Sequence, residues 1–334
     1  MSPVVRCFGG VLLAFLLFEV ALRPFVAGPN LSDGNRRTIR NYFEGLADAH
    51  FEADEFGTFG NRLTGNPPAG TSEGIILGDS HVIAQAVRDE ETMGAIIERL
   101  SRQSGHPLNV RQYGWTSANS PTFLAVAEPL LKKHNPAWVV VVLNSFNIGV
   151  NALTTTENWR MELGPGDSAR LIDMRATPKA ARERLRREIG RSALLLAIWR
   201  RLGLLNRRTA DASADASEHH PELAQAAARV PRATVAGLKR AYGWRLIIVY
   251  VPYFPGTHYD LADPQDQEVL ALCAEYGLPC LSMREALARD RYSRDRLSRG
   301  FQNTAPGEGH LNAIGHQIIA EEIWRYLSRS PFTS

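Results

Sequence analysis

Short apolar runs alternate with longer amphipathic segments over residues 73–328. The clearest run is Trp138–Leu143, which is six apolar residues long, and residues 245–251 have the same character. A continuous apolar run of this length is typical of a strand covered on both faces. Shorter runs predict three further strands, at residues 73–77, 108–113 and 278–282.

Helical periodicity fills the intervals between these strands. Between residues 82 and 104, apolar side chains recur about every 3.6 residues, which predicts a single helix. Ser120 and Pro121 open a second helix, expected to end near His134, and a last helix runs from Asn312 to about residue 328. Strands that alternate with helices indicate a parallel sheet with helices on both faces. The predicted fold is therefore a three-layer αβα domain over residues 73–330.

Two regions depart from this alternation. Residues 29–72 are polar and irregular, and are expected to form a lead-in segment that packs on the domain. Residues 151–241 are expected to be a basic helical insertion with a mobile, low-complexity loop near residues 209–221. A solvated helix face is the favoured interpretation of its arginines, and a face for anionic lipid headgroups or an anionic polymer is the alternative. These arginines are Arg182, Arg184, Arg186, Arg187, Arg191, Arg200, Arg201, Arg207 and Arg208.

The overall composition bears on two questions: whether the protein binds nucleic acid, and whether its cysteines form disulfides. Hydrophobic residues make up 44% of the 334 residues and charged residues 22%, as in an ordinary globular protein. A net charge of +3, without aromatic residues among the arginines, does not predict a nucleic-acid partner. Three cysteines do not make a disulfide framework. Free buried thiols are favoured over a bridge for Cys273 and Cys280.

Residues 1–28 indicate the cellular compartment in which the protein acts. Residues 7–22 are almost wholly apolar, with Glu19 as the one charged residue and Arg6 just before them. The stretch is shorter than the roughly 20 residues of a comfortable bilayer crossing, and longer than a signal-peptide core of roughly 7–15 residues. We expect an uncleaved apolar anchor helix within residues 1–28, with a cleaved signal peptide as the alternative. Both place the domain outside the cytoplasm, either periplasmic and anchored in the cytoplasmic membrane or secreted.

Candidate chemistry lies in two short motifs. The sequence Gly-Asp-Ser-His at residues 78–81 directly follows the first apolar run and precedes a helix. A serine at a tight strand-to-helix turn exposes its hydroxyl at the open end of the sheet, and its N–H faces any anion there. The sequence Glu-Gly-His at residues 308–310 lies in a glycine-rich loop before the last helix, at the same end of the sheet.

Together the two motifs resemble the first and last sequence blocks of the SGNH (GDSL-type) hydrolase superfamily. The resemblance covers residues 73–327 and implies a flavodoxin-like domain that cleaves esters through an acyl-serine. It implies Ser80 as the nucleophile and His310 as the base. Many relatives carry an aspartate three residues before the histidine, where this chain has Gly307. Others carry it two residues before the histidine, where this chain has Glu308. Glu308 is therefore assigned as the acid that orients the ring, and a dyad with His310 held by a backbone carbonyl is the alternative.

The resemblance also implies donors for the oxyanion of the reaction. The backbone N–H of Ser80 is the first donor, and Gly114, after the second strand, is expected to supply another. The third block of the family falls at residues 143–148, which assigns the side-chain amide to Asn147 and leaves Asn144 as the alternative. Asp79 is expected to hold the turn structurally, and His316 is also expected to be structural.

His81 gives the first motif the form found in SGNH domains fused to or partnered with membrane acyltransferases, which handle O-acetyl groups of envelope polysaccharides. The resemblance therefore implies a serine esterase that acts on O-acyl esters, O-acetyl above all, of an envelope glycan or lipid. A membrane acyltransferase or a polysaccharide-export complex is the partner that this implies. No metal, cofactor or nucleic acid is expected.

Two other functions stay open on the sequence alone. An O-acyltransferase would use the same acyl-enzyme and discharge it to a sugar hydroxyl instead of water. A catalytically degenerate domain would bind acylated polysaccharide without turning it over. Gly307, and Ile148 in the third block, stand where relatives carry an aspartate, and these departures would suit such a module.

Overall fold

The computed structural model describes residues 13–18, 20–21, 71–84, 86–155, 159–174, 221–254, 257–259, 263–301, 304 and 306–330, and the backbone of residues 29–31, 36–40, 48–53 and 59–61. The predicted arginine-rich helices and the loop near residues 209–220 lie outside these ranges, as do residues 1–12 and 22–28 of the expected anchor. Within the described ranges, no helix combines the length and the apolar composition that a membrane crossing requires.

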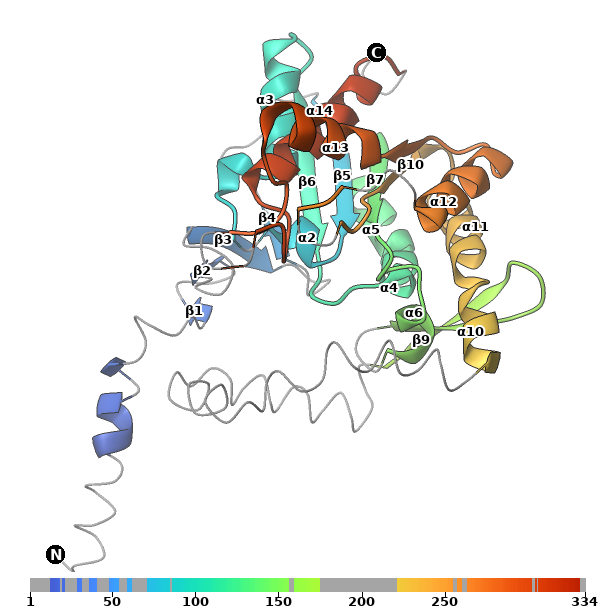
Figure 1. Ribbon diagram of the computed structural model, residues 1–334, viewed down its shortest axis with the longest axis horizontal. Coiled ribbons are helices and arrows are strands. Elements are labelled where there is room, and N and C mark those ends of the chain that lie inside the picture. The colour runs from blue at the N-terminus through green and yellow to red at the C-terminus, as the bar shows by residue number, and fades with distance from the viewer. Residues whose placement is uncertain are drawn as a thin grey trace, which may run out of the picture.

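A nine-stranded sheet forms the centre of the molecule, in the order β1-β2-β3-β4-β6-β5-β7-β10-β11 (Figure 1). Numbered along the chain, its five parallel strands lie in the order 2-1-3-4-5, which is the flavodoxin-like arrangement. The predicted parallel α/β core is confirmed. These strands are β5 (Ser72–Gly78), β6 (Leu108–Gly114), β7 (Trp138–Leu143), β10 (Leu246–Tyr250) and β11 (Cys280–Ser282).

The four remaining strands correct the expectation of an irregular lead-in. They pair antiparallel with their neighbours, and β4 pairs with β6, so the sheet is mixed and begins well before residue 73. Without them β6 would be an edge strand with a row of unpaired backbone groups. Pairing with β4 satisfies these groups through backbone hydrogen bonds, which polar side chains do not prevent. These strands are β1 (Pro29–Leu31), β2 (Arg36–Arg40), β3 (Asp48–Ala53) and β4 (Phe59–Asn61).

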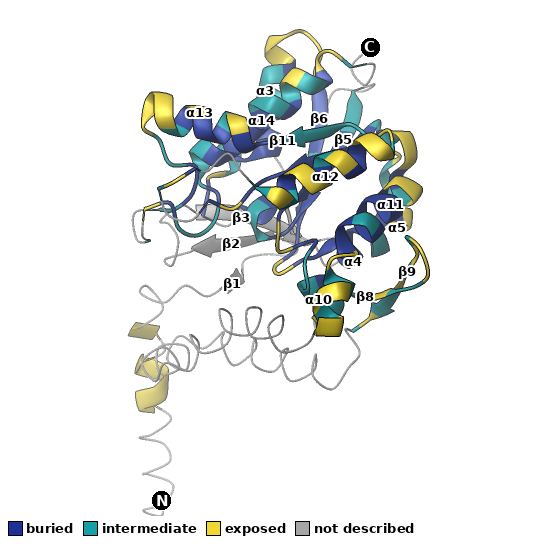
Figure 2. Cartoon of the chain, turned by 45° about the vertical axis from the view of Figure 1, so that its right-hand side comes forward, coloured by how far each residue is buried: buried dark blue, intermediate teal, exposed yellow. Residues whose placement is uncertain are grey.

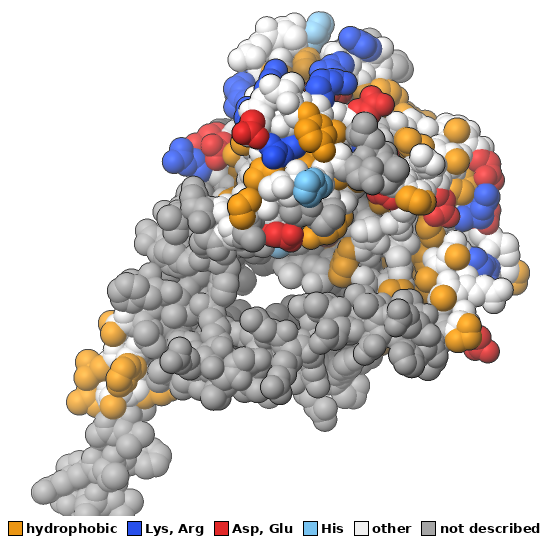
Figure 3. Space-filling model, viewed as in Figure 1, with side chains coloured by type: hydrophobic (Ala, Val, Ile, Leu, Met, Phe, Trp, Pro, Cys, Tyr) orange, Lys and Arg blue, Asp and Glu red, His pale blue; other side chains and the backbone are white. Residues whose placement is uncertain are grey.

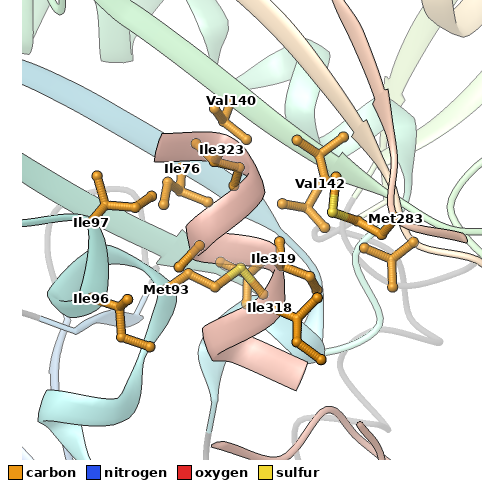
Figure 4. Packing of buried hydrophobic residues seen from close by; sticks show 14 of the residues in the cluster. Ile76, Met93, Ile96, Ile97, Val140, Val142, Met283, Ile318, Ile319 and Ile323 are labelled. Atoms are coloured by element: carbon orange, nitrogen blue, oxygen red, sulfur yellow. The ribbon is translucent and has the colours of Figure 1, made fainter. Parts of the chain in front are cut away.

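Helices cover both faces of the parallel strands (Figures 1 and 2). Successive side chains of a strand point to opposite faces, so Val140 and Val142 of β7 pack into one layer and Val139 and Val141 into the other. Figure 4 shows the first layer, in which Val140 lies near Ile323 of the last helix. The first layer holds α3 (Met93–Gln103), α13 (Arg284–Arg294) and α14 (Ala313–Leu327), and the second holds α4 (Ser120–Ala125), α5 (Ala127–His134), α11 (Val230–Tyr242) and α12 (Pro264–Glu275).

The helix expected between residues 82 and 104 is in fact three short elements. The first, α2 (Ser80–Ile83), ends at Ala84, whose φ of 58° lies in the left-handed region. A 3₁₀ turn, η1 (Asp89–Glu91), separates it from α3. The apolar spacing continues across the break because Val82 and Met93 contribute to the same buried cluster. The second predicted helix is likewise divided, into α4 and α5, and it begins at Ser120 with Asn119 as its N-cap.

The region expected to be a helical insertion is only partly helical where it is described. A short helix, α6 (Asn151–Thr154), is followed by two antiparallel strands, β8 (Trp159–Leu163) and β9 (Ala169–Asp173). The chain continues as a helix in α10 (Pro221–Ala227). The next helix, α11, packs in the second helical layer and so belongs to the main domain, which places the end of the insertion before residue 230 instead of 241.

Cys273 of α12 and Cys280 of β11 form a disulfide. The expectation of two free thiols is therefore wrong. A turn after α12 brings the two Cα atoms to 6.0 Å, within the range that a bridge requires. The bond ties the helix to the last strand of the sheet.

Candidate active site

A pocket of about 400 Å³ opens at the carboxyl ends of four neighbouring strands, β6, β5, β7 and β10. The second strand in chain order lies on one side of β5 and the third on the other, and clefts form at such a switch point. The fold thus places the loop after β5, with its Gly-Asp-Ser-His motif, in the middle of the pocket. The lining residues are Asp79, Ser80, His81, Thr116, Ser117, Asn144, Ser145, Phe146, Tyr253, Arg299 and His310.

Ser80 and His310 meet in this pocket. The Nε2 atom of His310 lies 2.7 Å from the hydroxyl oxygen of Ser80, although the residues are 230 positions apart in the sequence. This is hydrogen-bond distance, at which an unprotonated imidazole nitrogen can accept the hydroxyl proton. The structure therefore brings together the nucleophile and the base that the two sequence motifs predict.

Asp79 fixes the turn that carries Ser80. Its Oδ1 accepts a hydrogen bond from the His81 N–H at 2.9 Å, which caps α2. Its Oδ2 accepts from the side-chain amides of Asn144, at 2.8 Å, and Asn147, at 3.1 Å. None of these hydrogen bonds to the Asp79 carboxylate uses the backbone N–H of Ser80, the residue before His81. Asp79 thus has the contacts of the structural residue that the sequence predicts, and it joins the end of β5 to the loop after β7.

Asn147 is not placed to hold an oxyanion, which corrects its assignment. It is fully buried and outside the pocket, and its Nδ2 donates both to Asp79 Oδ2 and to the carbonyl oxygen of Ala118 at 2.8 Å. A side-chain amide has two N–H donors, so both are used. Asn144 does line the pocket, and its contact with Asp79 uses one of its two donors. The alternative that the sequence left open is therefore the one that the geometry favours.

Gly114 also lies outside the pocket lining, contrary to its expected role as an oxyanion donor. A Cβ atom at this position would lie 2.5 Å from the backbone nitrogen of Ile83 and 2.9 Å from the backbone carbonyl oxygen of Asp79, so the glycine allows β6 to pack against α2. Three residues later, Ser117 does line the pocket, with a φ of 55°. Such a backbone conformation is uncommon for serine and concentrates at functional sites. No local sequence signal marks it.

Glu308 lies beside the pocket. Its Oε2 accepts a hydrogen bond from the Tyr253 hydroxyl at 3.1 Å. Burial, followed by this contact with the Glu308 carboxylate, raises the pKa of Tyr253, which therefore stays a neutral donor. The expected role of Glu308 in orienting the His310 ring stays a prediction.

The backbone on both sides of His310 is held by its neighbours. Arg299 Nη1 donates to the Gly309 carbonyl oxygen at 3.3 Å, and the Leu311 N–H donates to His81 Nδ1 at 3.2 Å. The Gly300 N–H donates to the carbonyl oxygen of His310 itself at 3.1 Å. These contacts fix the loop that presents the imidazole to Ser80. Sequence reasoning missed Arg299, because a single arginine in a loop carries no signal of its own.

Burial governs the charges around this loop. Burial, then the positive charge of Arg299, lowers the pKa of His81 well below its ordinary value, so the ring stays neutral and Nδ1 can accept a hydrogen bond. Burial, then the neighbouring His310, lowers the pKa of His316 to about 3. His316 is wholly buried in α14, outside the pocket, as expected of a structural residue. The described residues contain no group of three or more His, Cys, Asp or Glu side chains that could hold a metal ion.

No protein-family model matches this chain, and none of the curated proteins matches it. Among solved structures, it is similar to a two-domain esterase active on acetylated mannans (TM-score 0.43, 12% identity), covering 78% of this chain and 49% of that one. It is also similar to a lipase/acylhydrolase from Enterococcus faecalis (TM-score 0.41, 10% identity), over 77% and 95% of the two chains. A third similar structure is a putative lipolytic protein of the G-D-S-L family from Desulfitobacterium hafniense (TM-score 0.39, 12% identity), over 76% and 99%. The chain spans about half the length of the mannan esterase.

Proposed function

We propose that this protein is a serine esterase that hydrolyses short O-acyl esters through an acyl-serine intermediate. The observation that carries the proposal is the 2.7 Å contact between His310 Nε2 and the Ser80 hydroxyl, inside an open pocket at the carboxyl ends of the parallel strands. The resemblance of the two motifs to the SGNH superfamily supports the same reaction. A degenerate domain that only binds acylated polysaccharide has no need for this contact between a hydroxyl and an imidazole, so the enzyme is the favoured proposal.

The first half of the reaction acylates Ser80. Its Oγ attacks the ester carbonyl carbon while its proton passes to His310 Nε2, and the carbonyl π electrons move to the oxygen. The proposed donors to this oxyanion are the backbone N–H groups of Ser80 and Ser117 and the second amide N–H of Asn144. The intermediate collapses, the bond to the alcohol oxygen breaks, and His310 returns the proton to that oxygen.

The second half releases the acid. A water molecule attacks the acyl-serine carbonyl carbon, and His310 Nε2 takes its proton. Collapse of the new tetrahedral intermediate breaks the bond to Ser80 Oγ, which recovers its proton from His310. The free carboxylic acid leaves and the enzyme is regenerated. A sugar hydroxyl in place of the water would give acyl transfer, which product analysis distinguishes.

The experiment that tests this function is p-nitrophenyl acetate hydrolysis by the wild type and by Ser80→Ala. Ser293→Ala is the matched control, because this serine is exposed on α13 and bonds only to its own helix. We expect Ser80→Ala to lower turnover by about 10³-fold or more and the control to leave it unchanged. Equal turnover by the wild type and Ser80→Ala would overturn the proposal.

We also propose that the enzyme acts outside the cytoplasm, attached to the membrane through residues 1–28. The Cys273–Cys280 disulfide supports this location, because such bonds persist in oxidising compartments. Fractionation of cells that express the full chain, beside a chain that begins at Gly28, tests it. Membrane association only of the full chain is the expected result, and equal cytoplasmic recovery of both would contradict it.

A further inference from the structure

We infer that Phe146 and Tyr253 form an aromatic rim that binds a sugar ring of the substrate, so that the esters cleaved are short acyl groups carried by a glycan. This inference rests on the proposed esterase function of the same pocket. It specifies the alcohol part of the ester, which the Ser80–His310 contact does not.

The two aromatic side chains are exposed where they line the pocket. Phe146 is 42% exposed and Tyr253 is 49% exposed, although both belong to large, mainly apolar residue types. A single exposed aromatic residue is ordinary, whereas two at the mouth of one pocket mark a binding surface. Nothing in the described part of the chain covers them.

Their position follows from the sheet. Strands β7 and β10 are parallel neighbours in which Leu143 pairs with Tyr250. Phe146 and Tyr253 each come three residues after this pair, so they project from adjacent loops at the same edge of the sheet. The loop after β7 lies beside the nucleophile because β7 is the direct neighbour of β5, and Tyr253 in the loop after β10 lines the same pocket as Ser80.

Contacts hold the Tyr253 ring and the backbone that carries Phe146. The Tyr253 hydroxyl donates to Glu308, and the guanidinium carbon of Arg299 lies 5.4 Å from the centre of its ring. The backbone N–H of Phe146 donates to Asn144 Oδ1 at 2.9 Å, which fixes the turn from which the Phe146 side chain projects. A ligand that stacks on the Tyr253 ring therefore loses little free energy in ordering it.

The other lining residues indicate what kind of ester fits. A sugar ring has an apolar face of C–H groups and an edge of hydroxyls, which suit aromatic rings beside the hydroxyls of Thr116, Ser117 and Ser145. A long acyl chain would need an apolar channel, because its binding depends on the burial of its CH₂ groups. Among the described residues that line the pocket, none is Leu, Ile, Val or Met. The pocket therefore fits a short acyl group beside Ser80 and a sugar at the rim.

The test compares three esters: methyl 4-O-acetyl-β-glucopyranoside, ethyl acetate, which has the same acyl group without a ring, and dioctanoylglycerol in micelles. The readout is the ratio of kcat/KM for the acetylated glycoside to that for ethyl acetate. We expect this ratio to fall at least tenfold in Phe146→Ala and in Tyr253→Ala, mainly through KM for the glycoside. Tyr253→Phe keeps the ring and loses the contact with Glu308, and should stay near the wild type.

Trp244→Ala is the matched control, because Trp244 is 66% exposed and precedes β10, at the opposite end of the strands. It should leave the ratio unchanged, and thermal melting checks that every variant is folded. Hydrolysis of the glycoside with an unchanged ratio in both alanine variants would overturn the aromatic rim alone. A selective loss on dioctanoylglycerol would assign the rim to lipid instead. Failure of the wild type on all three esters would overturn the esterase function as well.

Discussion

Asp79, Ser80 and His81 are consecutive, and each contacts a different part of the site. Asp79 accepts hydrogen bonds from the loop after β7, and His81 accepts one from the loop before α14. Ser80, between them, carries the hydroxyl that faces His310. One short motif after β5 therefore holds the loops that carry both the base and the proposed amide donor.

The two asparagines after β7 should differ in what their loss does. Asn144→Ala removes a proposed oxyanion donor as well as the hydrogen bonds to Asp79 and to the Phe146 N–H, so it should lower stability and also lower kcat by about 10²–10³-fold. Asn147→Ala leaves buried partners unsatisfied at Asp79 and Ala118, and should lower the free energy of unfolding by about 1–3 kcal/mol. Turnover and urea denaturation of both variants measure the difference. A larger loss of kcat in Asn147→Ala, at unchanged stability, would restore the assignment made from sequence.

His81 is expected to act as a positioning residue, through the loop that carries His310. His81→Asn keeps a side-chain acceptor for the Leu311 N–H, whereas His81→Leu removes it. We expect kcat to fall in the order wild type, Asn, Leu, with about tenfold or more between the first and the last and with little change in KM. If the two variants lose the same activity, or lose it in proportion to melting temperature, His81 is merely structural.

At the scale of elements, β7 shows what periodicity can predict. Its six residues are all buried, because helices cover both faces of the strand, and the apolar run marks its bounds. The end of α2 shows what periodicity misses. Ala84 adopts a left-handed conformation that alanine does not signal, and the surrounding tertiary contacts override its local preference.

His316 in α14 should make the fold sensitive to acid. Its pKa is about 3 in the folded protein, against an ordinary 6.5 that we expect in the unfolded chain. Between these values the unfolded chain binds a proton that the folded protein does not, so the free energy of unfolding falls as the pH falls. His316 alone should make the free energy of unfolding change by up to about 1.4 kcal/mol per pH unit in this range. The stability that comes from burying this ring in its neutral form is fully present above pH 6.5 and is lost as the pH falls.

Urea denaturation between pH 7 and pH 4 measures that slope. Methionine cannot take up a proton, so His316→Met should reduce the slope by the contribution of one bound proton. A Gln substitution at the exposed His106 should leave the slope unchanged. An identical slope in His316→Met and the wild type would show that this histidine is not buried as a neutral ring.

The disulfide between α12 and β11 predicts the thiol count of the purified protein. Titration of the denatured, unreduced full chain should give one free thiol, because Cys7 is the remaining cysteine of three. Reduction should lower the free energy of unfolding by roughly 2–3 kcal/mol, as expected for a short closed loop. Three free thiols before reduction would show that the bridge does not form.

At the scale of the whole molecule, the pocket depends on strand order more than on any one motif. Residues from the ends of four parallel strands and from the segment before α14 meet there. The sequence predicts Ser80 and His310 because each lies in a short motif that follows or precedes a regular element. It does not predict Ser117, Tyr253 or Arg299, whose place in the pocket arises only when distant segments come together.

The same dependence on tertiary contacts separates Asn144 from Asn147. Both follow β7 within four residues, and only the burial of Asn147 between Asp79 and Ala118 removes it from the pocket. On the face shown in Figure 3, basic and acidic side chains lie among one another over the described part of the surface.

The central claim is that Ser80 is a nucleophile activated by His310, and covalent labelling tests it most directly. Intact mass spectrometry after treatment with a fluorophosphonate should show one adduct on the wild type, mapped to Ser80 by peptide analysis. Ser80→Ala should take up none, and His310→Ala should react at least 10²-fold more slowly because the base is gone. A wild type that stays unlabelled, or a label that persists in Ser80→Ala, would contradict the account.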